Sequence, residues 1–109
     1  MTIVGPRPWH AAWPRHVPRS IAAPSVPAWW LLERNLPAFA SHVAVREVDH
    51  ETLGEGRVLT YEQLVRAARG VASGLRSLGV GRNVRVGLCL PNSAALILGY
   101  YGRTRPCRS

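Results

Sequence analysis

The longest regular pattern of apolar positions in the chain runs through residues 60–78. Apolar side chains recur there every three or four residues, which places them on one face of an α-helix. They are Leu64, Ala68, Val71, Leu75 and Leu78. The arginines of this segment fall largely off that face; they are Arg66, Arg69 and Arg76. The pattern predicts an amphipathic helix that buries one apolar stripe.

Start and stop signals frame this helix. Thr60 and Gln63 have the spacing of a capping box, in which each side chain accepts a hydrogen bond from the other residue's main-chain N–H. Gly79 suits the left-handed residue that ends many helices, and Val80 can then fold back on Leu75. We therefore expect the helix to begin after Thr60 and to end before Gly79.

Two β patterns flank the helix. Residues 43–49 (VAVREVD) are rich in valine and precede the turn-forming segment 50–56 and the short apolar pair Val58–Leu59, which predicts a β-hairpin. Residues 84–90 (VRVGLCL) alternate with period two, which predicts a strand covered on both faces. Cys89 is then expected to be a small core residue.

Shorter helices are expected at both ends of this region. Residues 28–36 (AWWLLERNL) have helical apolar spacing, and Pro37 is expected to end or kink the helix. We expect Trp29 and Trp30 to be packing residues rather than a ligand platform.

The segment after Pro91 predicts a further helix over residues 94–101, which Asn92 or Ser93 can cap. Hairpin, helix, strand and helix in this order predict an α/β unit with a right-handed crossover.

The two ends of the chain have a different character. Residues 1–27 contain six of the nine prolines, which remove amide donors and disfavour helix, so an extended or disordered leader is predicted. The alternative is a basic arm with Trp9 and Trp13 as aromatic anchors for nucleic acid. Residues 103–109 (RTRPCRS) lack apolar periodicity and are interpreted as a divergent basic tail.

Composition narrows the chemistry. The 109 residues and 12.0 kDa leave room for one small domain. All fourteen basic residues are arginine, and with six acids the net charge is +8. The acids all lie within residues 31–62, so the segments before and after them are basic. Either a coding bias toward arginine or contact with nucleic acid or an anionic membrane would explain this charge. The absence of lysine excludes Schiff-base chemistry and a phosphate-loop lysine.

No catalytic, cofactor-binding or metal-binding residue is predicted from short motifs. Gly79-Val80-Gly81 lacks the third glycine of a dinucleotide-binding run, and His50-Glu51 lacks the second histidine of a zinc-protease motif. Cys89 and Cys107 are too few for a disulfide scaffold and have no histidine at metal-ligand spacing. Without a secretory signal or an apolar run of about 20 residues, a cytoplasmic location is expected.

Three motifs in order resemble the N-terminal part of the adenylate-forming (AMP-binding) enzymes, which include acyl-CoA synthetases and fatty-acyl-AMP ligases. They are LTYEQL at 59–64, LRSLGV at 75–80 and VRVGLCLPNS at 84–93, and residues 28–45 match more weakly. The resemblance covers residues 28–102. Where the family usually has Gly-Asp, this chain has Asn83-Val84, and asparagine is the best replacement for glycine in a left-handed turn.

The resemblance implies a partial α/β N-terminal subdomain of a ligase that uses ATP, Mg²⁺ and coenzyme A to activate a carboxylic acid. The family's phosphate loop, ribose-binding acid and catalytic lysine lie beyond the segment present here. Thr60, Tyr61, Pro91 and Asn92 match family positions with structural roles. We therefore expect a truncated fragment of a fatty-acid–CoA ligase, inactive alone and binding none of these cofactors. Truncation, a frameshift and a natural terminus remain open as the origin of the end at residue 109.

Two other interpretations stay open. The chain could be a small basic module that contacts nucleic acid or a protein partner, although we expect no nucleic-acid partner. It could also be a fragment of marginal stability, because an incomplete sheet leaves apolar edges unpaired.

Overall fold

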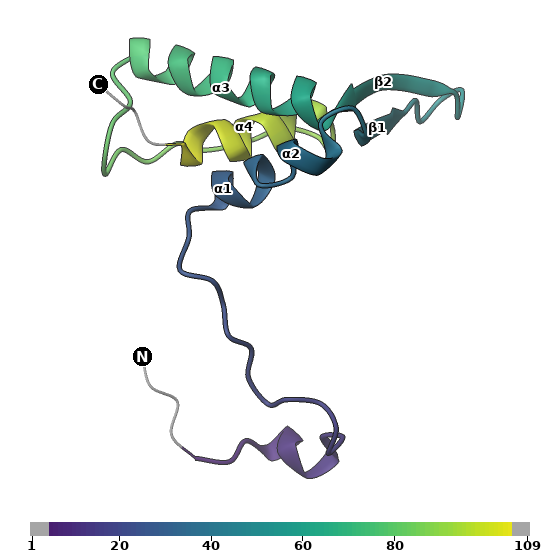
Figure 1. The fold of residues 1–109 in the computed structure, drawn as a ribbon, viewed down its shortest axis with the longest axis vertical. Coiled ribbons are helices and arrows are strands. Elements are labelled where there is room, and N and C mark those ends of the chain that lie inside the picture. The colour runs from purple at the N-terminus through teal and green to yellow at the C-terminus, as the bar shows by residue number, and fades with distance from the viewer. Residues whose placement is uncertain (1–4, 106–109) are drawn as a thin grey trace.

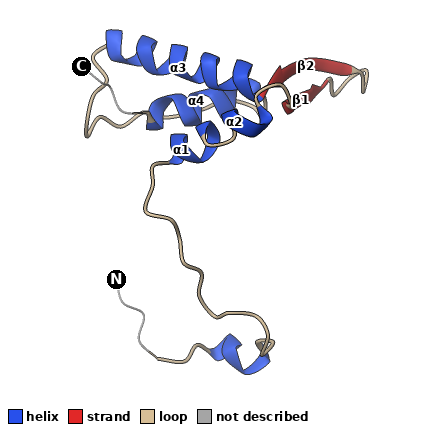
Figure 2. Ribbon diagram, viewed as in Figure 1, coloured by secondary structure: helices blue, strands red, loops and turns tan. Residues whose placement is uncertain are grey.

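The computed structural model describes residues 5–105, and Figure 1 shows helix α4 lying between α3 and α1, with a β-hairpin at one end. The elements in chain order are η1 (Pro8–Ala12), α1 (Ala28–Glu33), α2 (Leu36–Phe39), β1 (Val43–Val48), β2 (Glu55–Thr60), α3 (Tyr61–Ser77) and α4 (Ala94–Thr104). Figure 2 shows that helices make up most of the regular structure. The result is a small mixed fold, consistent with a partial α/β domain.

The leader extends away from the helices (Figure 1). The Cα radius of gyration is 18.4 Å, whereas a compact chain of this length would have about 13 Å. Within the leader, η1 is a single 3₁₀ segment whose start is held by the Arg7 N–H, which donates to His10 Nδ1 at 3.0 Å. The predicted extended leader thus contains a short helical turn in its described part, and residues 1–4 lie outside the described residues.

The predicted hairpin is confirmed. Strands β1 and β2 pair antiparallel, with Val43 opposite Thr60 and Val48 opposite Glu55. The return strand begins at Glu55, three residues before the predicted Val58. The turn is fastened by Asp49, whose carboxylate accepts hydrogen bonds from the main-chain N–H groups after it.

Helix α3 begins and ends where its sequence signals predict. Thr60 Oγ1 accepts from the Gln63 N–H at 3.2 Å, and Gln63 Oε1 accepts from the Thr60 N–H at 2.9 Å. At the other end Gly79 has φ +87°, and the Val80 N–H donates to the Leu75 carbonyl at 3.0 Å. These bonds complete the capping box and the left-handed C-terminal cap.

The core is small and sits where α3 meets α1, the hairpin and α4. Leu32, Leu64 and Val65 are buried, and Ala68 and Ala94 are the other buried apolar residues of the described chain. Val65 was not in the predicted stripe; it is buried because α3 contacts the hairpin as well as α1 and α4. Leu78 was predicted in the stripe but is 81% exposed, because it is the C-cap residue, where helical periodicity stops.

The first predicted helix is divided in two. Helix α1 ends at Glu33, and Pro37 lies in the first turn of α2. Main-chain N–H groups in the first turn have no hydrogen-bond partner within the helix, so the N–H that proline lacks is not needed there. Pro37 therefore starts a helix rather than ending one. Trp29 is partly buried as expected, but Trp30 is exposed. The guanidinium carbon of Arg34 lies over the Trp30 ring, 5.3 Å from the ring centre.

The predicted strand at residues 84–90 is wrong. Within residues 5–105 the sheet has only β1 and β2, and no described segment pairs with residues 84–90. An unpaired segment cannot form the ladder that defines a strand, so the predicted crossover is not formed either. The segment instead lies along α4, where a Cβ on Gly99 would be 2.9 Å from Leu88 Cδ2. Cys89 is exposed rather than in the core.

Helix α4 runs three residues past its predicted end, to Thr104. Ser93 is its N-cap residue but makes no capping bond, and its hydroxyl donates to the Pro91 carbonyl instead. The cap comes from Glu47 of β1, whose Oε1 accepts from the Ala94 N–H. No helix within residues 5–105 is both long and apolar enough to cross a membrane.

Candidate functional site

The four residues that match family motifs occupy two separate places. Thr60 and Tyr61 lie at the junction of β2 and α3, where Thr60 caps the helix and the Tyr61 ring packs against the core. Pro91 and Asn92 precede α4, and both are exposed. The structure does not bring the four into one cavity, and their contacts are those of caps and packing residues.

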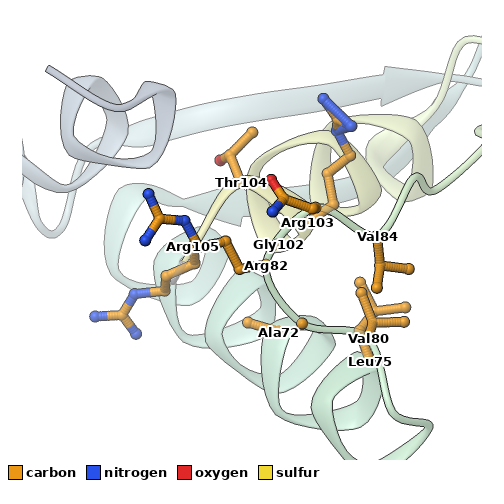
Figure 3. Close-up of a pocket in the computed structure, with 11 residues that line it drawn as sticks. Ala72, Leu75, Val80, Arg82, Val84, Gly102, Arg103, Thr104 and Arg105 are labelled. Carbon is orange, nitrogen blue, oxygen red and sulfur yellow. The ribbon is translucent and has the colours of Figure 1, made fainter. Parts of the chain in front are cut away.

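A concave site lined by three arginines lies between the C-terminal ends of α3 and α4, and we call it the α3–α4 cavity (Figure 3). Its volume is about 510 Å³. The described residues that line it come from the two helix ends and the connection between them; they are Ala72, Leu75, Val80, Gly81, Arg82, Asn83, Val84, Gly102, Arg103, Thr104 and Arg105. Figure 3 shows Arg82 and Arg105 on one side of this cavity and Arg103 on another.

Two left-handed residues shape one wall of the α3–α4 cavity. Gly79 turns the chain back at the end of α3. Asn83 follows with φ +66°, and the Val84 N–H donates to the Gly81 carbonyl at 3.2 Å. Asparagine at position 83 thus adopts the left-handed turn expected for it from the sequence, and this turn carries Arg82 at its tip.

A close helix crossing shapes the opposite wall. Gly102 is buried in α4, and a Cβ built on it would lie 2.6 Å from Val71 Cγ1 and 3.1 Å from the Ala68 carbonyl oxygen. Only glycine permits this approach of α4 to α3. The crossing brings residues 103–105, which were interpreted as part of a divergent basic tail, to the edge of the cavity.

Arg105 is held at that edge by two contacts. Its Nε forms an ion pair with Glu33 Oε1 at 3.2 Å, and its guanidinium carbon lies 5.4 Å from the centre of the Trp29 ring. Arg69 of α3 reaches the same oxygen at 3.1 Å. Glu33 thus joins α1, α3 and the end of α4, and its side chain is only 16% exposed.

A second cavity, of about 580 Å³, lies between β1 and the start of α4, and we call it the hairpin cavity. Arg46, Glu47, Asn92 and Ser93 supply its polar lining. Three of these groups already have partners: Glu47 binds the Ala94 N–H, Arg46 pairs with Glu55 across the hairpin, and the Ser93 hydroxyl donates to the Pro91 carbonyl.

Titratable chemistry is sparse in the described chain. The one resolved shift is at Asp49, where hydrogen bonds from the Thr52 and Glu51 main-chain N–H groups lower the pKa of the carboxyl group. Asp49 lines neither cavity. Within residues 5–105 no three His, Cys, Asp or Glu side chains gather closely enough to hold a metal ion, and Cys107 lies outside the described residues.

These features favour binding over catalysis at the α3–α4 cavity. Its lining combines three guanidinium groups with apolar side chains and holds no nucleophile beside a base. Motif searching missed this cluster because Arg82 and Arg105 are 23 positions apart in sequence and meet only through the fold. The available signal was compositional, since no Asp or Glu follows Glu62.

Comparison with known proteins gives one match. The model of a family described as AMP-binding enzyme matches residues 32–105, or 74 of the 109 residues. The matched range contains every residue named in the lining of the two cavities. No curated protein and no solved structure matches the chain significantly.

Proposed function

The chain belongs to the AMP-binding enzyme family, and on that premise we propose that it is the N-terminal part of an acyl-activating enzyme of the fatty-acid–CoA ligase type. The observation that carries the proposal is the match over residues 32–105, which contains the three ordered motifs at 59–64, 75–80 and 84–93. A cytoplasmic location is part of the same proposal.

The proposed reaction of the whole enzyme has two steps. A carboxylate oxygen attacks the α-phosphorus of ATP, which forms an acyl-adenylate and releases pyrophosphate. A thiol such as that of coenzyme A then attacks the acyl carbon, which forms a thioester and releases AMP. Both steps develop negative charge that cations must offset.

The residues described here do not fit the groups that this reaction needs. The sequence has no lysine to meet the reacting carboxylate. The described chain offers no carboxylate cluster for magnesium. We therefore assign no step to a residue of this chain and propose that it is inactive alone. Its residues act as scaffold: Thr60 and Glu47 cap helices, and Gly102 sets the distance between α3 and α4.

An assay of pyrophosphate release tests the proposed inactivity. The purified chain is incubated with ATP, Mg²⁺ and a panel of acids from acetate to palmitate, beside an active acyl-CoA synthetase as the assay control. We expect no release above background. Release that requires both ATP and an acid would show that the chain has adenylation activity of its own.

A chimera tests the family role directly. Residues 32–105 replace the corresponding segment of an active acyl-CoA synthetase, and acid-dependent pyrophosphate release is measured. We expect activity to survive, and to fall when the chimera carries Gly102→Ala, because that change separates two scaffold helices. A folded chimera with no activity would count against the scaffold role.

A basic binding module is the alternative. The net charge of +8 favours it, but two of the exposed α3 arginines have acidic partners, Arg66 with Glu62 and Arg69 with Glu33. Such a module would bind oligonucleotides at low salt and lose affinity steeply as salt is added. Absence of binding at low salt would eliminate nucleic acid as its partner.

A further inference from the structure

We propose that the α3–α4 cavity binds a small organic phosphate, in which a phosphate group is attached to a compact apolar body. The phosphate would lie between Arg82 and Arg105, and the apolar body would lie against Leu75, Val80 and Val84. This inference rests on the charge and shape of the cavity and does not depend on the proposed ligase function.

Uncompensated positive charge is the first argument. Three arginines and no acidic residue are among the described residues that line the cavity. Within residues 5–105, Arg82 and Arg103 have no ion-pair partner, while Arg105 shares Glu33 with Arg69. A guanidinium has five N–H donors, so Arg105 keeps donors for a ligand while it is paired with Glu33. Arginine pairs with the oxygens of a carboxylate or a phosphate through paired hydrogen bonds. Because a phosphate group carries more negative charge than a carboxylate at pH 7, three arginines favour the phosphate.

The apolar wall is the second argument. Ala72, Leu75, Val80 and Val84 lie beside the arginines, and Val84 is 50% exposed. Inorganic phosphate would leave this wall in contact with water. A ligand with an apolar body would cover it, and the removal of apolar surface from water favours binding. A volume of about 510 Å³ leaves room for such a body beside the phosphate.

Preorganisation is the third argument. The turn that carries Arg82 is fixed by the left-handed residues Gly79 and Asn83 and by the bond between the Val84 N–H and the Gly81 carbonyl. Arg105 is fixed by Glu33 and by the ring of Trp29. The backbone that carries both arginines would therefore lose little conformational entropy when a ligand binds, which favours measurable affinity for a small molecule.

A titration of the full 109-residue chain tests the proposal. Amide ¹H–¹⁵N spectra are recorded at low salt with phenyl phosphate, inorganic phosphate and phenol as three separate probes. We expect saturable shifts for phenyl phosphate at Gly81, Asn83 and Gly102, and weaker binding of the other two probes. Equal affinity for phenyl phosphate and inorganic phosphate would overturn the role of the apolar wall.

Two matched variants test the contribution of Arg82 to phosphate binding. Arg82→Gln should weaken phenyl phosphate binding by about tenfold or more, because it removes a charge-assisted hydrogen bond. Arg85→Gln, three residues away and outside the lining, removes the same charge and should leave the affinity unchanged. Unchanged amide shifts in α1 verify that both variants keep the fold.

An equal loss in the two variants, or no loss in either, would overturn the site in favour of diffuse attraction to a basic surface. The titration contains no ATP and no acyl acid, so its failure would leave the proposed ligase function untouched.

Discussion

The carboxylate of Glu47 in β1 accepts a hydrogen bond from the main-chain N–H of Ala94, the first residue of α4, at 2.7 Å. This bond joins the hairpin to a helix 47 positions further along the chain. It satisfies one of the free amides at the start of α4 and places negative charge at the positive end of the helix dipole. Because Ser93 makes no capping bond, Glu47 acts as the cap of α4 through the tertiary fold.

Glu47→Ala should therefore destabilise the packing of α4 against the hairpin. We expect a loss of about 1 kcal/mol in the free energy of unfolding, which is the usual cost of removing an N-terminal cap. Urea unfolding followed by circular dichroism at 222 nm measures it. Glu51→Ala is the matched control, because Glu51 is an exposed carboxylate in the hairpin turn, and it should change stability far less.

Glu47→Gln separates the two contributions of the cap. The amide oxygen can still accept the Ala94 N–H, but the charge near the helix dipole is lost, so we expect an intermediate loss. A Glu47→Ala variant as stable as its Glu51→Ala control would show that this bond does not stabilise the fold in solution.

Gly102→Ala should destabilise the fold, although it adds only one methyl group. The added methyl group would lie 2.6 Å from Val71 Cγ1 and 3.1 Å from a main-chain oxygen, so α4 must move away from α3. Overpacking of this kind costs typically about 1–3 kcal/mol. Thermal unfolding should show a lower midpoint.

Gly74→Ala, in helix α3, should have the opposite effect on stability. A Cβ at position 74 meets nothing within 4 Å, and alanine favours helix over glycine by roughly 0.5–1 kcal/mol. This variant should raise the unfolding midpoint. If Gly102→Ala and Gly74→Ala shifted the midpoint in the same direction, the close crossing at Gly102 would be contradicted.

Sequence alone predicted the parts of the fold whose determinants are local. The start and end of α3 depend on Thr60, Gln63 and Gly79, all within a few positions of the helix ends. The hairpin likewise follows from two short β patterns around a turn. For these elements the capping and turn chemistry is written in adjacent residues, so no knowledge of the tertiary structure is needed.

The errors at residues 84–90 and at the cap of α4 share one cause, which is dependence on distant partners. Residues 84–90 have the alternation of a strand, but a strand also needs a neighbour, and none of the described segments supplies one. Cys89 is exposed for the same reason. The cap of α4 was sought in Asn92 or Ser93, whereas Glu47 lies far away in sequence.

The α3–α4 cavity could not be predicted from neighbouring residues in the sequence either. Its two walls depend on the crossing at Gly102 and on the turn at Asn83, and only Asn83 carried a signal that could be read in advance. Arg105 was assigned to a divergent basic tail, yet Glu33 and Trp29 hold it against α1.

Thr60→Ala should lower stability through the capping box. It removes the hydroxyl that accepts the Gln63 N–H at 3.2 Å, and such a substitution costs typically about 1 kcal/mol. Ser73→Ala, at an exposed position inside α3, is the control and should be neutral or slightly stabilising. Hydrogen exchange of the amides at the start of α3 should accelerate in Thr60→Ala alone; equal exchange in both variants would contradict the role of the box.

The hairpin turn should respond to acid through Asp49. Its Oδ1 accepts from the Glu51 N–H at 2.8 Å and from the Thr52 N–H at 2.9 Å. These bonds, that from Thr52 foremost, favour the ionised form and lower the pKa of Asp49 below its ordinary value of 3.8. A carboxyl group with a lowered pKa in the folded state stabilises that state at pH values above its ordinary pKa. This contribution is lost as the pH falls through the lowered value.

We therefore expect the Glu51 and Thr52 amide resonances to be constant from neutral pH down to the ordinary pKa of aspartate, and to shift together at lower pH. A titration by ¹H–¹⁵N spectroscopy measures the midpoint. Asp49→Asn is the control: it cannot ionise, so the shared low-pH shift of the two amides should disappear. A midpoint above 3.8 in the unmodified chain would contradict the proposed direction, because it would mean that the folded turn favours the protonated carboxyl group.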